Sequence, residues 1–169
     1  MKKILALVVL ALVLSGGTIL QADEVIELKE KIIEIRNKGE LGFSDFTVCS
    51  QIMGFASYAA IPNNVVDING TLLVYYEPEN IFTSMKDGIY EIWYTQDMSL
   101  LDESGELIKE WLDILNFHYM TKKPFIDMFA QNSLEIKGQL PAGKYKFQAV
   151  LKDKLRNKSV TKVIDFVVK

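Results

Sequence analysis

The sequence predicts a mainly β fold: one antiparallel β-sandwich over residues 40–169, preceded by an amphipathic helix over residues 23–39. Three observations support this prediction. Hydrophobic residues recur at helical spacing before residue 39 and at a period of two after it. The predicted strands follow one another across turns without intervening helices, which is typical of antiparallel pairing. Hydrophobic residues make up 49% of the 169 residues, enough to build the core of one domain.

Residues 1–22 have the pattern of a secretory signal peptide. Lys2 and Lys3 form a positive start, an unbroken apolar run follows over Ile4–Leu14, and small residues from Ser15 onward end it. This order of charge, apolar stretch and small residues is typical of an exported protein. The sequence therefore predicts a secreted or periplasmic location.

Cleavage after Gly17 and cleavage after Ala22 both fit the pattern. If the apolar run is counted on to Leu20, it approaches the roughly 20 residues that a membrane-spanning helix needs, so we expect membrane contact only if the signal is uncleaved. Residues 1–22 carry two of the 19 basic residues and none of the 22 acidic ones, so their removal changes the net charge from −3 to −5. An acidic surface predicts no nucleic acid among the partners.

The predicted helix carries Val25, Leu28, Ile32 and Ile35 at spacings of three, four and three, and Gly39 ends it. We expect this apolar stripe to pack on the helix's own domain. Self-association through residues 25–35 is the alternative, because the same spacing fits a coiled-coil seam. The stripe covers only two heptads, fewer than a firm coiled-coil prediction requires.

The predicted strands are Phe43–Met53, Thr71–Glu77, Ile89–Thr95, Leu107–Met120, Ile126–Leu140 (one strand or two), Lys144–Asp153 and Ser159–Lys169. Pro78 should end the second, because proline cannot donate to a ladder. The segment Leu107–Met120 also fits a helix, but the strands on both sides favour a strand. In that interpretation residues 102–105 form the preceding turn.

The segment Leu140–Tyr145 reads Leu-Pro-Ala-Gly-Lys-Tyr. It resembles the entry into the penultimate strand of immunoglobulin-like and fibronectin-like sandwiches, where a tyrosine hydroxyl caps nearby backbone in a tyrosine corner. The resemblance implies structural roles for Pro141 and Gly143 in the turn and for Tyr145 in the corner. It covers about the last 45 residues well, and the cysteine pair of antibody-type domains is missing. It implies an immunoglobulin-like sandwich but no particular function.

Residues with catalytic or metal-binding chemistry are sparse. His118 is the only histidine and Cys49 the only cysteine, and apolar residues surround His118 in the sequence. No elbow motif surrounds a serine, and one cysteine with one distant histidine does not make a zinc site. Cys49 is expected to be a partly buried free thiol, and pairing with a cysteine of another molecule is the alternative. The sequence thus predicts a protein that is not an enzyme and has no metal and no cofactor.

Two aromatic residues are the candidate binding residues. If Leu72, Val74 and Tyr76 face the core on one strand, and Tyr90, Ile92 and Tyr94 do so on another, alternation sends Tyr75 and Trp93 to the outside. We expect the N-terminal helix to cover them. The alternative is an exposed stacking surface, which would suit a sugar or a protein.

The export signal, the strand-rich body and the missing catalytic set together predict an exported, non-catalytic binding or assembly module. Its expected partner is a protein or a component of the cell envelope. The second interpretation is a carbohydrate-binding module that uses Tyr75 and Trp93, and the third is a small enzyme with a pocket around His118.

Overall fold

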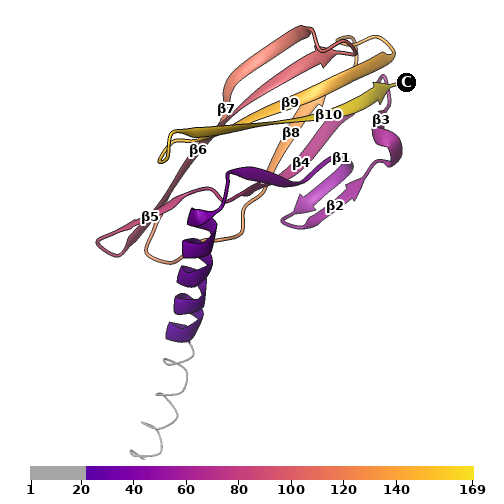
Figure 1. Cartoon of the computed structure of the whole chain (residues 1–169). Coiled ribbons are helices and arrows are strands. Elements are labelled where there is room, and N and C mark those ends of the chain that lie inside the picture. The colour runs from indigo at the N-terminus through magenta and orange to yellow at the C-terminus, as the bar shows by residue number, and fades with distance from the viewer. Residues whose placement is uncertain (1–21) are drawn as a thin grey trace, which may run out of the picture.

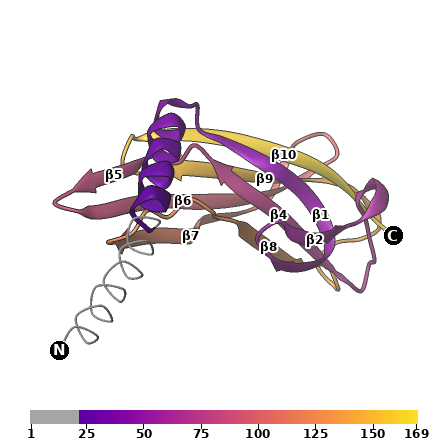
Figure 2. The same cartoon turned by 90° about the horizontal axis from the view of Figure 1, so that it is seen from below.

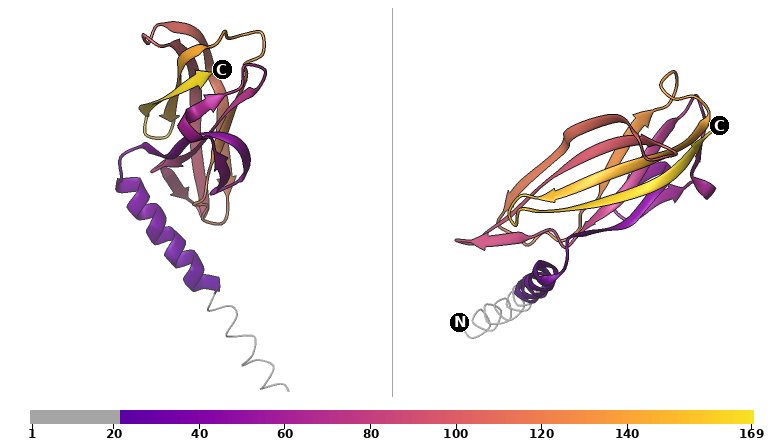
Figure 3. Two further views of the ribbon diagram at one scale, coloured as in Figure 1. Left: turned by 90° about the vertical axis from the view of Figure 1, so that its right-hand side faces the viewer. Right: turned by 45° about the horizontal axis from the view of Figure 1, so that its top comes forward.

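The computed structural model describes residues 22–169, in which two β-sheets face each other and one helix, residues 22–38, lies at one end (Figures 1 and 3). The prediction of a mainly β sandwich preceded by a single helix is confirmed. The expected signal segment lies almost entirely outside the described residues. Within them, no helix has the length and the apolar character needed to cross a membrane.

The first sheet has four antiparallel strands in the order β2-β1-β4-β8. Its strands are β1 (Gly42–Gly54), β2 (Ser57–Ala60), β4 (Thr71–Glu79) and β8 (Ala130–Glu135). β4 continues through Pro78 to Glu79, so the prediction that Pro78 ends the strand is wrong. At Pro78 only β1 pairs with β4, since β8 reaches no further than Tyr76, so a missing donor is tolerated there.

The second sheet has the order β3-β10-β9-β6, and both β5 and β7 pair with β6. Its strands are β3 (Val65–Val66), β5 (Thr83–Lys86), β6 (Ile89–Asp102), β7 (Leu107–Thr121), β9 (Gly143–Asp153) and β10 (Lys158–Val168). All pairs are antiparallel except β3 with β10. The segment Leu107–Met120, which also fitted a helix, is thus a strand. Residues 126–129, which we expected to begin a strand, belong to a loop.

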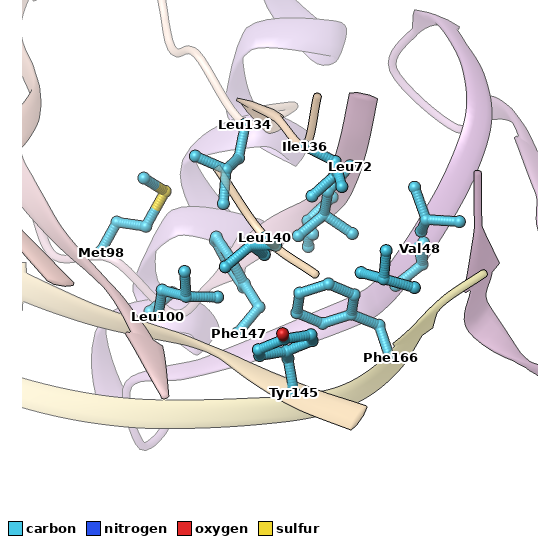
Figure 4. Packing of buried hydrophobic residues seen from close by; sticks show 14 residues of the cluster. Val48, Leu72, Met98, Leu100, Leu134, Ile136, Leu140, Tyr145, Phe147 and Phe166 are labelled. Atoms are coloured by element: carbon cyan, nitrogen blue, oxygen red, sulfur yellow. The ribbon is translucent and has the colours of Figure 1, made fainter. Parts of the chain in front are cut away.

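The core lies between the sheets because one side of each strand is apolar (Figure 4). From β4 it receives Leu72, Val74 and Tyr76, as the alternation predicts, and from β9 Phe147 and Leu151. Cys49 is a free thiol in this chain and is fully buried, deeper than the partial burial that we expected.

A chain of three polar side chains crosses this core. The Tyr76 hydroxyl donates to Oε1 of Gln96, and Nε2 of Gln96 donates to Oδ1 of Asn132 at 2.8 Å. The three residues belong to β4, β6 and β8 and therefore join the two sheets. Each is buried, so these hydrogen bonds satisfy groups that would otherwise be costly in an apolar interior.

The N-terminal helix docks on the end of the sandwich by its C-terminal half (Figure 2). Ile33 is its buried apolar contact. The side chain of Asn37 donates to the carbonyl of Thr83 and accepts from its amide, at 2.8 and 2.9 Å. The Tyr90 hydroxyl donates to Glu30. The helix is therefore fixed beside β5.

Arg156, in the turn between β9 and β10, ties the end of the helix to the sheet. Its guanidinium donates to the carbonyls of Asn37 and Gly39, both at 3.3 Å, and to that of Asn80. The same group pairs with the carboxylate of Asp153, whose side chain is fully buried. Three chain segments therefore meet at one side chain.

A wide bulge interrupts the pairing of β6 with β7. Gln96 pairs with Leu115 and Met98 with Trp111, so three residues of β7 oppose one of β6. Asp113, at the centre of the bulge, has a φ of 47°. Its amide donates to Oδ1 of the outward-facing Asp97 at 2.9 Å, which anchors the bulge to the sheet.

Candidate functional site

The outer face of the six-stranded sheet carries the clearest cluster of polar and aromatic side chains. Tyr90, Ile92 and Tyr94 of β6 are buried in the core, so the residues between them point outward. We call the cluster around this strand the Trp93 site. It comprises Glu91, Trp93 and Thr95 on β6, Asn116 and His118 on β7, and Lys152 and Lys154 at the end of β9.

Trp93 and His118 form a stacked pair across β6 and β7. Their ring centroids are 4.7 Å apart and the ring planes differ by 25°. The indole Nε1 donates to Oδ1 of Asn116 at 3.0 Å, and Nε2 of His118 lies 2.8 Å from Oε1 of Glu91. Each ring is therefore held by its own polar partner, which fixes the pair as a rigid platform.

Lysine side chains border the platform on the β9 side. The Nζ of Lys154 lies 5.9 Å from the centroid of the Trp93 ring, and the side chain is exposed. Lys152 pairs with Oδ2 of Asp97 at 2.6 Å and lies 3.8 Å from Asp113. None of the ion pairs found among residues 22–169 involves Lys154, so its ammonium group is free to meet an anion.

The charges beneath the lysines are fixed by the fold. Burial raises the pKa of Asp97, but the amide of Asp113 and the ammonium of Lys152 outweigh it, so the pKa lies below its ordinary value. The hydrogen bond to Asp97 raises the pKa of Lys152. Asp97 is thus a carboxylate and Lys152 an ammonium ion at neutral pH.

Thr95 lies in the middle of the Trp93 site and has an unsatisfied hydroxyl. The residue is 4% exposed, and its Oγ1 is the one buried side-chain polar atom in the described part of the chain without a hydrogen-bond partner. Thr95 pairs with Asn116 on one side and Lys152 on the other. Buried polar groups in native proteins are nearly always bonded, so this one needs an explanation.

Further along β9 the outer face is hollowed. An open hollow of about 580 Å³ is lined by Lys144, Lys146, Asp165 and Asn64, among others. Lys146 pairs with Asp165 at 2.7 Å, and Lys144 pairs with Glu103 at the same distance. The outer face thus carries lysines at both ends of β9.

The structure separates the two residues that the sequence paired as a binding surface. Trp93 faces outward on the second sheet. Tyr75 lies on the first sheet and is fully buried, stacked on Tyr58 at 4.3 Å and on Phe129 at 5.7 Å. Its hydroxyl donates to Glu77 at 2.6 Å. Tyr75 is therefore not accessible to a ligand.

The prediction that the helix covers both aromatic residues is also wrong. Tyr75 is covered by the β1–β2 hairpin and the loop before β8, and Trp93 is bordered by His118. The helix instead meets β5. Its amphipathic pattern alone could not show which of several apolar surfaces it would contact.

Pro141 lies in the loop before β9, and Gly143 and Tyr145 lie at the start of β9. The Tyr145 hydroxyl donates to the carbonyl of Pro141 at 2.9 Å, and the ring stacks on Phe166. A Cβ on Gly143 would lie 3.4 Å from the Tyr145 ring, which is ordinary van der Waals contact.

Residues 22–169 bring together no group of three or more His, Cys, Asp or Glu side chains that could hold a metal ion. His118, the one histidine, has a carboxylate and an indole as neighbours. The sequence missed the pairing of His118 with Trp93, because that pairing depends on the bulge in β7.

Comparison with known proteins gives little to add. No family model and no curated protein matches the chain. Among solved structures it is similar to the Pseudomonas fluorescens alkylpurine DNA glycosylase AlkC bound to DNA containing an abasic site analog. The likeness has 9% identity and a TM-score of 0.44 and covers 78% of this chain and 31% of that one.

This likeness disagrees with the function expected from sequence. The similar protein is an enzyme bound to DNA, whereas we expected an exported, non-catalytic module without nucleic acid among its partners. We correct these expectations and no longer exclude catalysis or nucleic acid. A likeness this weak carries no argument about the function of this chain, so neither property is inferred from it. It does not bear on self-association through residues 25–35, which stays a prediction.

Proposed function

We propose that the Trp93 site binds a ligand that combines a planar ring with an anionic group, the chemistry of a nucleotide unit. The observation that carries the proposal is the stacked pair of Trp93 and His118 beside the free ammonium group of Lys154. A ring stacks on the aromatic pair while its anionic group meets Lys154. The weak likeness to a DNA glycosylase contributes nothing to this proposal.

The magnitudes favour a modest affinity. Stacking of a base on an aromatic side chain contributes about 1–3 kcal/mol. The other lysines of this face are held in ion pairs, so one free ammonium group adds little beyond the stacking. The exposed amide of Asn116 supplies a polar group for the ring edge. We therefore expect weak binding, with a logarithmic salt slope of only about one.

The net charge of the chain does not decide the question. It is −3 over the whole sequence, but ligand binding depends on the charges of one face. Lys144, Lys146, Lys152 and Lys154 all lie along β9 or directly after it, on the outer face. A single strand that runs along β9 would pass all four lysines, but it would have to displace the carboxylates that pair with Lys144, Lys146 and Lys152.

The test follows the fluorescence of Trp93 in a Trp111→Phe variant, in which it is the only tryptophan. The purified protein is titrated with thymidine monophosphate and with oligo-thymidylate at low salt. Quenching by both supports a nucleotide site, and tighter binding of the strand supports a track along β9. If neither ligand changes the fluorescence, the proposal is wrong.

Matched variants locate the site. In the protein with both tryptophans, Trp93→Phe should abolish the quenching. In the Trp111→Phe background, Lys154→Gln should weaken binding about three- to tenfold and reduce the salt slope by about one. The control is Lys137→Gln, an exposed lysine on the loop after β8, which should leave binding unchanged. Equal effects of the two lysine variants would contradict the placement of the site.

We also propose that the sandwich is immunoglobulin-like. The hydrogen bond from Tyr145 to Pro141 and the final β9–β10 hairpin support this assignment. A solved structure of an immunoglobulin-like domain that superposes on residues 40–169 with the same strand order would test it. A different strand order in the closest superposition would contradict it.

Export is a separate proposal, supported by the charge and apolar pattern of residues 1–22. N-terminal sequencing of the protein from its native cell tests it. A new terminus after Gly17 or Ala22 is expected, and an intact Met1 on cytoplasmic protein would overturn it.

A further inference from the structure

The N-terminal helix has two apolar sides, and the domain uses only one of them. Ile33 is 7% exposed and packs on the sandwich. The other side carries Val25, Leu28, Ile32 and Ile35, which are 49%, 52%, 37% and 70% exposed. The helix extends away from the sandwich, so this side is open to solvent along its length (Figures 1 and 3). Four large apolar residues in one row are unusual on a solvent-exposed helix.

We propose that this row pairs two copies of the chain as a parallel two-stranded coiled coil. The four residues take the a, d, a and d positions of two heptads, with Val25 and Ile32 at a. Val25 at a with Leu28 at d is the combination that favours two parallel strands, whereas Ile32 with Ile35 in the second heptad also suits a trimer. The inference does not rest on the proposed ligand site.

One of the two pairs of flanking charges favours the parallel register. With Val25 at a, Glu24 takes a g position and Lys29 the following e position, so each Glu24 faces Lys29 of the other copy in a parallel pair. The symmetric arrangement forms this contact twice. Lys31 and Arg36 face each other in the second heptad, which is unfavourable and limits the affinity.

A lipid surface fits the same row less well. Anionic membranes attract helices whose polar face is rich in lysine and arginine. Residues 22–38 carry five acidic and four basic residues: Asp23, Glu24, Glu27, Glu30, Glu34 and Lys29, Lys31, Arg36, Lys38. Without a positive excess there is no electrostatic attraction to such a membrane, whereas paired copies satisfy Glu24 and Lys29.

Two heptads form a short seam, so we expect a weak dimer with a Kd on the order of 10–100 µM. Sedimentation of the purified protein over a range of concentrations should show a monomer that converts to a dimer. Ile32→Glu should abolish the dimer, and the melting temperature of the monomer should not fall, because Ile32 does not support the sandwich. Glu34→Gln, on an exposed position beside the seam, is the control and should leave the dimer intact.

Cysteine cross-linking tests the parallel register in a Cys49→Ala background. Val25→Cys should form an intermolecular disulfide, because equivalent a positions meet in a parallel pair, and Glu34→Cys should not. Charge exchange gives a second test: Glu24→Lys should weaken the dimer, and adding Lys29→Glu should restore it.

Three results would overturn the proposal. The first is a protein that stays monomeric throughout and does not cross-link at Val25. The second is a dimer that Ile32→Glu leaves unchanged, which would place the interface elsewhere. The third is a monomer that binds vesicles of phosphatidylcholine and phosphatidylglycerol through this row, since a lipid surface would then be its occupant.

Discussion

Nε of Arg156 lies 3.0 Å from Oδ2 of Asp153, in an ion pair whose carboxylate is fully buried and whose guanidinium side chain is 15% exposed. The carboxylate also accepts backbone amides from Phe82 and Leu155, at 2.9 and 3.0 Å. Arg156 and Asp153 therefore provide hydrogen-bond partners for backbone groups at the end of the helix, at the start of β5 and in the β9–β10 turn.

Arg156→Ala should lower the free energy of unfolding by about 2–4 kcal/mol, because it leaves a buried carboxylate without its cation. Urea denaturation measures the change. Lys158→Ala is the control: its pair with Glu40 is exposed, so the loss should be below about 0.5 kcal/mol. A loss below about 1 kcal/mol for Arg156→Ala would mean that the backbone amides alone stabilise Asp153.

Stability should fall as the pH rises above 10. Burial and the hydrogen bond to Glu77 raise the pKa of Tyr75 to about 12, and the bond to Glu30 raises that of Tyr90 to about 12. Burial raises the pKa of Tyr94 to about 12. Each folded-state pKa lies above the unfolded value of about 10, so the contribution is complete below pH 10 and lost toward pH 12.

Absorbance at 295 nm measures this tyrosine ionisation. In the folded protein it should be delayed and should coincide with loss of the native circular dichroism. Ordinary titration near pH 10 of all seven tyrosines in a still-folded protein would contradict the prediction.

Gln96→Leu should destabilise the protein by about 2–4 kcal/mol, because it leaves the buried Tyr76 hydroxyl and the buried Asn132 amide without their hydrogen-bond partner. Adding Asn132→Leu should recover part of the loss, because a second unpaired group is removed. A double-mutant cycle by urea denaturation measures this coupling. Simple addition of the two losses would show that the groups act independently.

Thr95→Val should leave the free energy of unfolding unchanged or raise it by up to about 1 kcal/mol, because it removes a buried hydroxyl that has no partner. The same variant should leave nucleotide binding unchanged, because the hydroxyl is buried and a ligand on the surface does not reach it. Thermal unfolding with and without ligand checks both expectations. A clear destabilisation without ligand would reveal a partner for the hydroxyl.

Alternation along the strands was enough to predict which residues fill the core. Leu72, Val74 and Tyr76 point inward as expected, because side-chain direction is a local property of a strand. Whether an outward-facing residue is covered depends on segments that are distant in the sequence. Tyr75 is covered by Tyr58 and Phe129, which come from distant segments, so no pattern within β4 could show it.

The candidate site depends on a register that the sequence does not reveal. Leu100 pairs with Lys109, and in that register Trp93 would oppose Asn116. The two extra residues at the bulge shift the pairing so that Trp93 opposes His118. The sequence predicted an outward-facing Trp93, but its stacking partner follows from the bulge alone.

The bulge at Asp113 has a further consequence for the behaviour of the protein at high concentration. β7 is the free edge of its sheet, and it exposes Leu112 and Ile114 on either side of Asp113. A flat edge of this length would be a template for open-ended fibril growth. The Asp113 amide instead turns back to Asp97, so the edge offers no continuous ladder to an incoming strand. Straightening the bulge by deleting two of its residues should make the protein more prone to aggregate than the unaltered chain.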